Sequence, residues 1–126
     1  MKVVANSTLV ALMTALGEAL ALADSFGLDG DDVLDVLAES PIGAPVRSKR
    51  RHIESDTYPP NFKLALASKD ASLVLRAGEA AGLELRVAAA AADWMAGADR
   101  AGLGDLDYSA VIAQIRGTPA KLAASE

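Results

Sequence analysis

The chain has 126 residues, of which 52% are hydrophobic and 4% aromatic, with no cysteine and a formal net charge of −5. This length suits one domain; the absence of cysteine excludes a disulfide scaffold, a thiolate nucleophile and cysteine-ligated metals; and the negative charge argues against a nucleic-acid binder. Alanine supplies 27 of the 126 residues, about 21%, with few β-branched or aromatic runs, which predicts an all-α domain.

The first predicted helix runs from Lys2 to Phe26 and stops at Gly27, a residue type common at helix C-termini. Its apolar stretch approaches the roughly 20 residues needed to cross a bilayer, but polar residues such as Asn6 and Glu18 interrupt it. The N-terminus also shows no basic segment followed by a small-residue cleavage site, as a secretory signal would. We therefore predict a cytoplasmic protein with no membrane partner.

This long helix is apolar on nearly every face, so protein must cover it where lipid does not. A domain of 126 residues has little material to surround such a helix. We therefore predict a homodimer built around the first helix, with Leu9, Leu16 and Leu20 in the interface.

Capping residues, glycines and prolines divide the rest of the chain into about five shorter helices. Asp29 is a candidate N-cap for the second helix and Asp107 for the last one. Pro59 and Pro60 mark the clearest loop, and the residues after Pro119 are expected to fray. The predicted helices cover residues 31–39, 44–54, 62–80 and 85–101, and the last one contains Val111, Ile112 and Ile115.

The third predicted helix carries a basic cluster, Arg-Ser-Lys-Arg-Arg at residues 47–51. This cluster could bind phosphate or nucleic acid, but it is short, has no interleaved aromatic residues and belongs to a net acidic chain. We interpret it as a solvated helix face and predict no nucleic-acid partner. His52 is the only histidine, and without a second histidine or a carboxylate pair beside it we predict no metal site.

Three short motifs occur in a characteristic order along the chain. Residues 2–6 read Lys-Val-Val-Ala-Asn, and residues 62–70 place a Lys-Asp pair seven and eight positions after Phe62. Residues 104–110 read Gly-Asp-Leu-Asp-Tyr-Ser-Ala. Together these motifs resemble the C-terminal helical domain of the β-hydroxyacid dehydrogenases, whose best-known members are 3-hydroxyisobutyrate dehydrogenase and tartronate semialdehyde reductase.

The resemblance implies a helical bundle like the C-terminal domain of 6-phosphogluconate dehydrogenase, with one long central helix. Members of the family are NAD(P)-dependent enzymes that carry an N-terminal Rossmann domain, whose Gly-rich turn holds the cofactor pyrophosphate. No such turn occurs in this sequence. We therefore expect residues 1–126 to be the substrate and dimerisation half of a 3-hydroxyacid dehydrogenase, to bind NAD or NADP only weakly, and to be inactive alone.

Lys2 and Asn6 are four residues apart, which places both on one face of a helix. When an aldehyde or ketone accepts a hydride, negative charge grows on the carbonyl oxygen, and a nearby ammonium can stabilise it and supply a proton. The resemblance implies that Lys2 is this catalytic group and that Asn6 binds the substrate. From the residues alone, a solvated lysine and a helix-end asparagine remain open alternatives.

The second motif supplies three further candidates. The resemblance implies that Lys69 approaches the cofactor near its nicotinamide end, with Asp70 in a supporting role, either orienting a lysine or capping a helix. It also implies that Phe62 walls the substrate pocket. The alternatives are a surface lysine paired with Asp70 or Glu79, and a phenylalanine that belongs to the core.

Two positions help to choose within the family. Ala5 stands where classical 6-phosphogluconate dehydrogenases have a histidine, and Lys2 is present where imine reductases usually replace the motif lysine. Both positions favour a dehydrogenase that acts on a small hydroxyacid or semialdehyde. An imine-reductase-like domain and a helical dimerisation or interaction module without chemistry remain the alternatives.

Overall fold

The computed structural model describes residues 1–122. Within them the only β-type pairings are two isolated bridges, so the all-α prediction is confirmed. A short π-helical turn, η1, and a 3-10 turn, η2, separate the fifth and sixth α-helices. The elements are α1 (Lys2–Ser25), α2 (Gly30–Ala38), α3 (Gly43–Ser55), α4 (Leu64–Ala80), α5 (Arg86–Ala98), η1 (Asp99–Leu103), η2 (Tyr108–Ala110) and α6 (Val111–Arg116).

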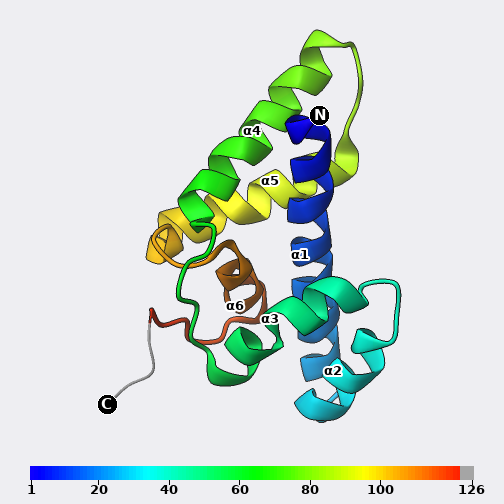
Figure 1. The fold of residues 1–126 in the computed structure, drawn as a ribbon, viewed down its shortest axis with the longest axis vertical. Helices are drawn as coiled ribbons and strands as arrows, with labels where there is room; N and C mark the ends of the chain where they lie inside the picture. The colour runs from blue at the N-terminus through cyan, green and yellow to red at the C-terminus, as the bar shows by residue number, and fades with distance from the viewer. Residues whose placement is uncertain (123–126) are drawn as a thin grey trace.

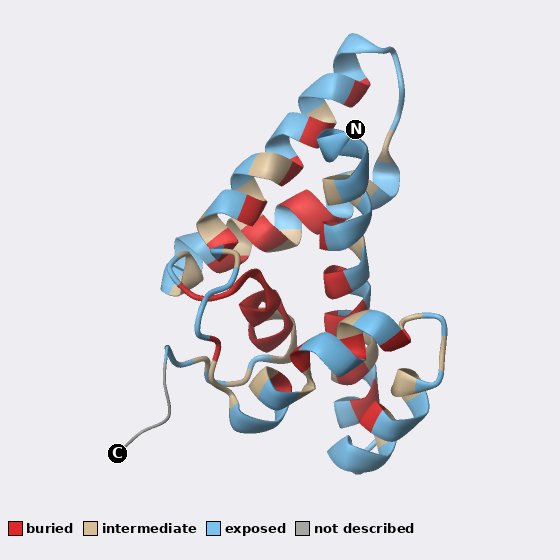
Figure 2. Ribbon diagram, viewed as in Figure 1, coloured by how far each residue is buried: buried red, intermediate tan, exposed pale blue. Residues whose placement is uncertain are grey.

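Helix α1 is the axis of the domain, and each of the five other α-helices contacts it. Figure 1 shows α4 and α5 beside the N-terminal half of α1, and α2 and α3 beside its C-terminal half. Helix α6 lies between these two groups and packs against the middle of α1. Figure 2 shows that the buried residues face inward between these elements, and the first half of α6 is buried.

Gly17 allows the closest contact between α1 and α6. A Cβ atom at this position would lie 2.7 Å from Cδ1 of Ile115 and 3.3 Å from Cα of Ile112. Glycine inside a helix costs roughly 0.5–1 kcal/mol relative to alanine. The packing of α6 offsets this cost, since Ile112 is fully buried. The small residue at position 17 therefore serves the core of this chain itself.

The glycines and capping aspartates of the sequence lie at helix ends, as predicted. Gly27 and Gly117 follow α1 and α6 with φ of 69° and 74°, in the left-handed region that favours glycine. Asp29 caps α2, since its carboxylate accepts a hydrogen bond from the backbone N–H of Asp32 at 3.0 Å. Asp107 likewise caps the turn that leads into α6.

Three boundaries differ from the prediction because of contacts within the fold. Helix α5 ends at Ala98 and continues as the π-helical turn, in which Gly102 has φ 95°. Helix α4 begins only at Leu64, because the backbone just before it forms hydrogen bonds with the turn that precedes α6. The segment after α6 is paired rather than frayed: the backbone N–H of Tyr58 donates to the carbonyl oxygen of Lys121 at 2.7 Å. Residues 123–126 lie outside the described residues.

One face of α1 packs into the core and another is uncovered. Leu16 and Leu20 are 0% and 2% exposed, so the prediction that they lie in a dimer interface is wrong. Leu12, Leu22 and Phe26 lie on the uncovered face, whereas Leu9, which is 36% exposed, shares the face of the buried Leu16 and Leu20. By length and composition alone α1 could cross a membrane, a test that core helices of soluble proteins also pass, and only 33% of its most apolar window is buried.

Candidate active site

The predicted site residues come from two helices that lie side by side. Lys2 and Asn6 occupy the first turns of α1, and Lys69 and Asp70 occupy the second turn of α4. Helix α4 packs along the N-terminal half of α1 (Figure 1). This packing brings the first and second motifs together, although more than sixty residues separate them in the sequence.

A hydrogen bond joins the two motifs. The side-chain Nδ2 of Asn6 donates to Oδ2 of Asp70 at 3.0 Å, and the bond is partly buried. Hydrogen bonds to a charged partner contribute about 1.5–3 kcal/mol. The partner of Asp70 is thus the amide of Asn6 and not a lysine or a helix end, and its supporting role in a site stays a prediction.

The two lysines of the predicted site are exposed. Lys2 precedes Asn6 by one helical turn, and Lys69 precedes Asp70 by one residue. Neither ammonium forms an ion pair within the described part of the chain, so Lys69 is not paired with Asp70 or Glu79. Both charges are thus available to an anionic or polarised ligand.

The surroundings of these four residues are open rather than enclosed. A groove of about 400 Å³ lies on another flank of α1, between Ser7 and Thr8 and the start of α5, and is not lined by Lys2, Lys69 or Asp70. The small cavity that Asn6 lines has a volume of only about 10 Å³. The described residues around Asn6 and Asp70 therefore form an open surface and not a closed pocket.

Phe62 belongs to a different neighbourhood. Its ring packs against Tyr108, with ring centroids 5.3 Å apart, and it borders the hydrophobic core. Its backbone is held on both sides, because its N–H donates to Oδ1 of Asp107 at 3.1 Å and its carbonyl accepts from the N–H of Tyr108 at 2.7 Å. These contacts give Phe62 a structural role in this chain, and its part in a substrate pocket stays a prediction.

The centre of this second neighbourhood is a buried ion pair that sequence reasoning missed. Nζ of Lys49 lies 2.9 Å from Oδ2 of Asp107, and the two side chains are 6% and 0% exposed. Asp107 also accepts hydrogen bonds from Ser109 and from the backbone N–H groups of Asn61 and Phe62. One carboxylate thus connects α3, the loop before α4 and the turn before α6.

Burial and hydrogen bonding act in opposite directions on Asp107. Burial alone would raise the pKa of its carboxyl, but hydrogen bonds from Ser109, Lys49 and the two backbone N–H groups together hold this pKa below its usual value. The same burial, with the negative charge of Asp107 beside it, raises the pKa of Tyr108 to about 12. The cluster is therefore an ionised carboxylate that is surrounded by hydrogen-bond donors, among them the ammonium of Lys49, and by the neutral ring of Tyr108.

The interpretation of the basic cluster as a solvated face is wrong at Lys49. Val46, Lys49 and Ile53 are all buried, and they recur at the spacing of one helix face. This periodicity was the available signal, because a lysine that shares a face with two aliphatic residues points into the core. Arg50 fits the predicted solvated face better than Lys49 does, because it forms an ion pair with the exposed Asp35 at 2.8 Å.

His52 has structural contacts only. Its Nδ1 lies 3.0 Å from the carbonyl oxygen of Thr57, and its ring stacks on that of Tyr58 at 6.0 Å. Among residues 1–122, no three His, Cys, Asp or Glu side chains lie close enough together to hold a metal ion.

Comparisons with known proteins agree on one family. The model described as NAD-binding of NADP-dependent 3-hydroxyisobutyrate dehydrogenase matches residues 1–115. Glyoxylate/succinic semialdehyde reductase 1 of Arabidopsis thaliana is 38% identical over 117 residues, which cover 92% of this chain and 40% of that protein.

Two solved structures share the fold. The 3-hydroxyisobutyrate dehydrogenase of Salmonella typhimurium has a TM-score of 0.81 and 28% identity, covering 88% of this chain and 39% of its own. The enzyme of that name from Mycobacterium tuberculosis, solved with L-serine, has a TM-score of 0.72 and 28% identity, covering 91% and 42%. The chain thus spans about two-fifths of the length of these relatives. It belongs to the 3-hydroxyisobutyrate dehydrogenase-like family of β-hydroxyacid dehydrogenases.

Proposed function

We propose that this chain is the helical half of an NAD(P)-dependent 3-hydroxyacid dehydrogenase and contributes the proton-transfer lysine, part of the substrate site and the dimer contact. The observation that carries the proposal is the hydrogen bond between Asn6 and Asp70. It joins the two helices on which the lysines of the family motifs, Lys2 and Lys69, stand exposed. Such a cluster of polar and cationic groups on an open face suits a reaction at a carbonyl oxygen.

In this proposal Lys2 handles the proton. Its ammonium donates a proton to the carbonyl oxygen of the substrate during reduction and recovers it from the alcohol in the reverse direction. Its positive charge also stabilises the negative charge that grows on that oxygen. Asn6, one turn along α1, holds a substrate oxygen within reach of this lysine. The nicotinamide cofactor, when bound, supplies or accepts the hydride.

The residues of this chain fit only part of such a cofactor. Lys69 is exposed and outside any ion pair of the described residues, which suits an anionic group of the dinucleotide. Residues 1–122 form no strand followed by a Gly-rich turn and a helix, the unit that binds the pyrophosphate in Rossmann domains. The proposal therefore includes a separate Rossmann domain that covers the open face beside Asn6.

The names of the relatives suggest the class of substrate. They include a glyoxylate/succinic semialdehyde reductase and two 3-hydroxyisobutyrate dehydrogenases, one solved with L-serine. These names share a small acid that carries an aldehyde or a hydroxyl group. We propose the same class for this chain, acting in the cytoplasm.

A reconstitution experiment tests the function. We expect the purified chain alone to oxidise no NADH or NADPH in the presence of glyoxylate or succinic semialdehyde. Fusing it behind the Rossmann domain of a relative, such as the Salmonella typhimurium enzyme, should produce that activity, and the Rossmann domain alone is the control. Activity of the chain alone contradicts the proposal, and an inactive but correctly folded fusion favours the interaction module without chemistry.

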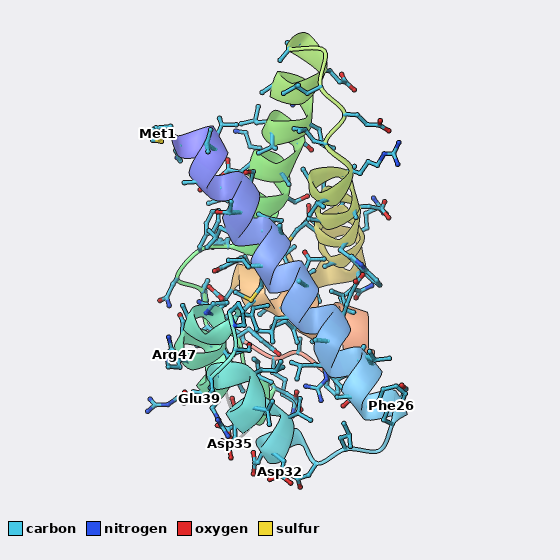
Figure 3. The ribbon with its side chains drawn as sticks, turned by 90° about the vertical axis from the view of Figure 1, so that its right-hand side faces the viewer. Met1, Phe26, Asp32, Asp35, Glu39 and Arg47 are labelled. Carbon is cyan, nitrogen blue, oxygen red and sulfur yellow. The ribbon has the colours of Figure 1, made fainter. Side chains whose placement is uncertain are left out.

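We further propose that the uncovered face of α1 forms the homodimer contact. Leu12, Leu22 and Phe26 are 43%, 57% and 68% exposed, and their spacing places them along one stripe of the helix. Figure 3 shows α1 crossing the front of the molecule from Met1 to Phe26, with no other helix covering it from this side. A second copy of the chain would remove this apolar stripe from water.

Sedimentation of single variants tests this contact. We expect the unmutated chain to have twice the 12.9 kDa mass of one copy. Leu12→Asp should raise the dissociation constant at least about 100-fold, because it leaves an unpaired carboxylate in an apolar interface. Leu66→Asp, at an exposed leucine of α4, is the matched control and should remain dimeric. A stable monomer for the unmutated chain rules the contact out.

A further inference from the structure

The hydrogen bond between Asn6 and Asp70 determines which way the asparagine amide faces. An ionised carboxylate has acceptors only, whereas an asparagine side chain has a carbonyl oxygen at one end and an NH2 group at the other. Nδ2 of Asn6 is the atom that lies 3.0 Å from Oδ2 of Asp70. The opposite orientation would place two oxygens against each other, so Asp70 forces Oδ1 of Asn6 to face away from it.

Oδ1 of Asn6 is also open to solvent. Within residues 1–122 it accepts no hydrogen bond, and only Oγ1 of Thr118 is both buried and without a partner. Oδ1 of Asn6 therefore reaches the surface, on the helix that carries Lys2 one turn earlier. A free carbonyl oxygen of this kind accepts hydrogen bonds and cannot donate them.

We propose that Asp70 is a positioning residue that locks the amide of Asn6, so that its carbonyl oxygen accepts a hydrogen bond from the hydroxyl group of the ligand. The identity of the ligand rests on the proposed function, but the lock itself does not. The locked oxygen distinguishes the two forms of the substrate, because an alcohol can donate a hydrogen bond to it and an aldehyde cannot. Asp70 thereby favours binding of the hydroxyacid without touching it.

Nuclear magnetic resonance of the chain tests the lock directly. The sequence contains only three side-chain carboxamides, those of Asn6, Asn61 and Gln114, so their NH2 signals can be assigned by single substitutions. Asp70→Ala should move the Asn6 signals toward those of an unstructured peptide and speed their exchange with water about tenfold. The other two carboxamides should not change. Glu79→Ala, at an exposed carboxylate of the same helix, is the control.

The kinetics of the reconstituted enzyme test the acceptor role. Asp70→Asn preserves size but offers both a donor and an acceptor, so it permits both orientations of the Asn6 amide. We expect it to raise KM for the hydroxyacid about tenfold and to change KM for the semialdehyde much less. Equal changes in the two KM values overturn the acceptor role. If the NH2 signals of Asn6 do not change in Asp70→Ala, the lock is overturned. The resonance experiment gives its answer even if the fusion has no activity.

Discussion

Replacing Lys49 with methionine is expected to lower the free energy of unfolding by about 3–5 kcal/mol. The substitution keeps most of the length of the side chain but leaves the carboxylate of Asp107 fully buried without its cation, which lies 2.9 Å away in the native chain. Domains are stable by only about 5–15 kcal/mol in total. Urea denaturation should therefore show the variant at or near its folding threshold.

A double-mutant cycle separates the ion pair from a simple loss of packing. Asp107→Asn removes the charge and should also be destabilising, because it leaves Lys49 buried and unpaired. The double variant Lys49→Met with Asp107→Asn should lose less stability than the sum of the two single variants. Lys63→Met, in an exposed pair with Asp105 at 3.7 Å, is the control and should hardly change the midpoint. Additive effects in the cycle would contradict the coupling.

The pH dependence of the free energy of unfolding is a second test of the pair between Lys49 and Asp107. The folded-state pKa of Asp107 lies below its usual value, which is about 3.9 in an unfolded chain. Stability from this group is therefore present above about pH 4 and is lost as the pH falls through the folded-state pKa. We expect Asp107→Asn to lack this part of the acid-induced loss, so that its stability falls less steeply than that of the unmutated chain.

The parts of the fold that sequence reasoning predicted are those set by neighbouring residues. Gly27 ends α1 and Asp29 begins α2 through contacts within a few residues, so each signal can be read in place. The all-α class follows from composition in the same way. The three family motifs identified the domain because their order along the chain is itself a sequence property.

The parts that were not predicted depend on pairs that are distant in the sequence. The spacing of its helix face indicates that Lys49 is buried, but not that its partner is Asp107, 58 positions later, and likewise Asp70 meets Asn6 across 64 positions. No periodicity encodes such partners. The apolar character of α1 on every side also hid its orientation, so that the buried Leu16 was taken for an interface residue. Contacts between elements, not propensities, decide these points.

Replacing Lys2 with alanine is expected to lower kcat of the reconstituted enzyme by about 100- to 10,000-fold, the usual contribution of a general acid–base group. The side chain is exposed and outside any ion pair of residues 1–122, so its removal should leave the midpoint of urea denaturation unchanged. Loss of activity without loss of stability is the signature of a group that acts on the substrate. Lys63→Ala, at another exposed lysine, should retain activity.

One further variant and a chemical-rescue experiment distinguish proton transfer from charge alone. Lys2→Arg keeps the positive charge, but a guanidinium remains protonated in proteins and cannot exchange a proton with the substrate. It should therefore remain nearly as slow as Lys2→Ala if Lys2 transfers the proton, and recover most of the rate if only the charge matters. Methylamine added to Lys2→Ala should restore part of the rate, because a small amine can occupy the space of the lost ammonium and donate a proton in its place. An arginine variant with near-normal kcat, or an alanine variant that retains full activity, would remove Lys2 from the proton-transfer role.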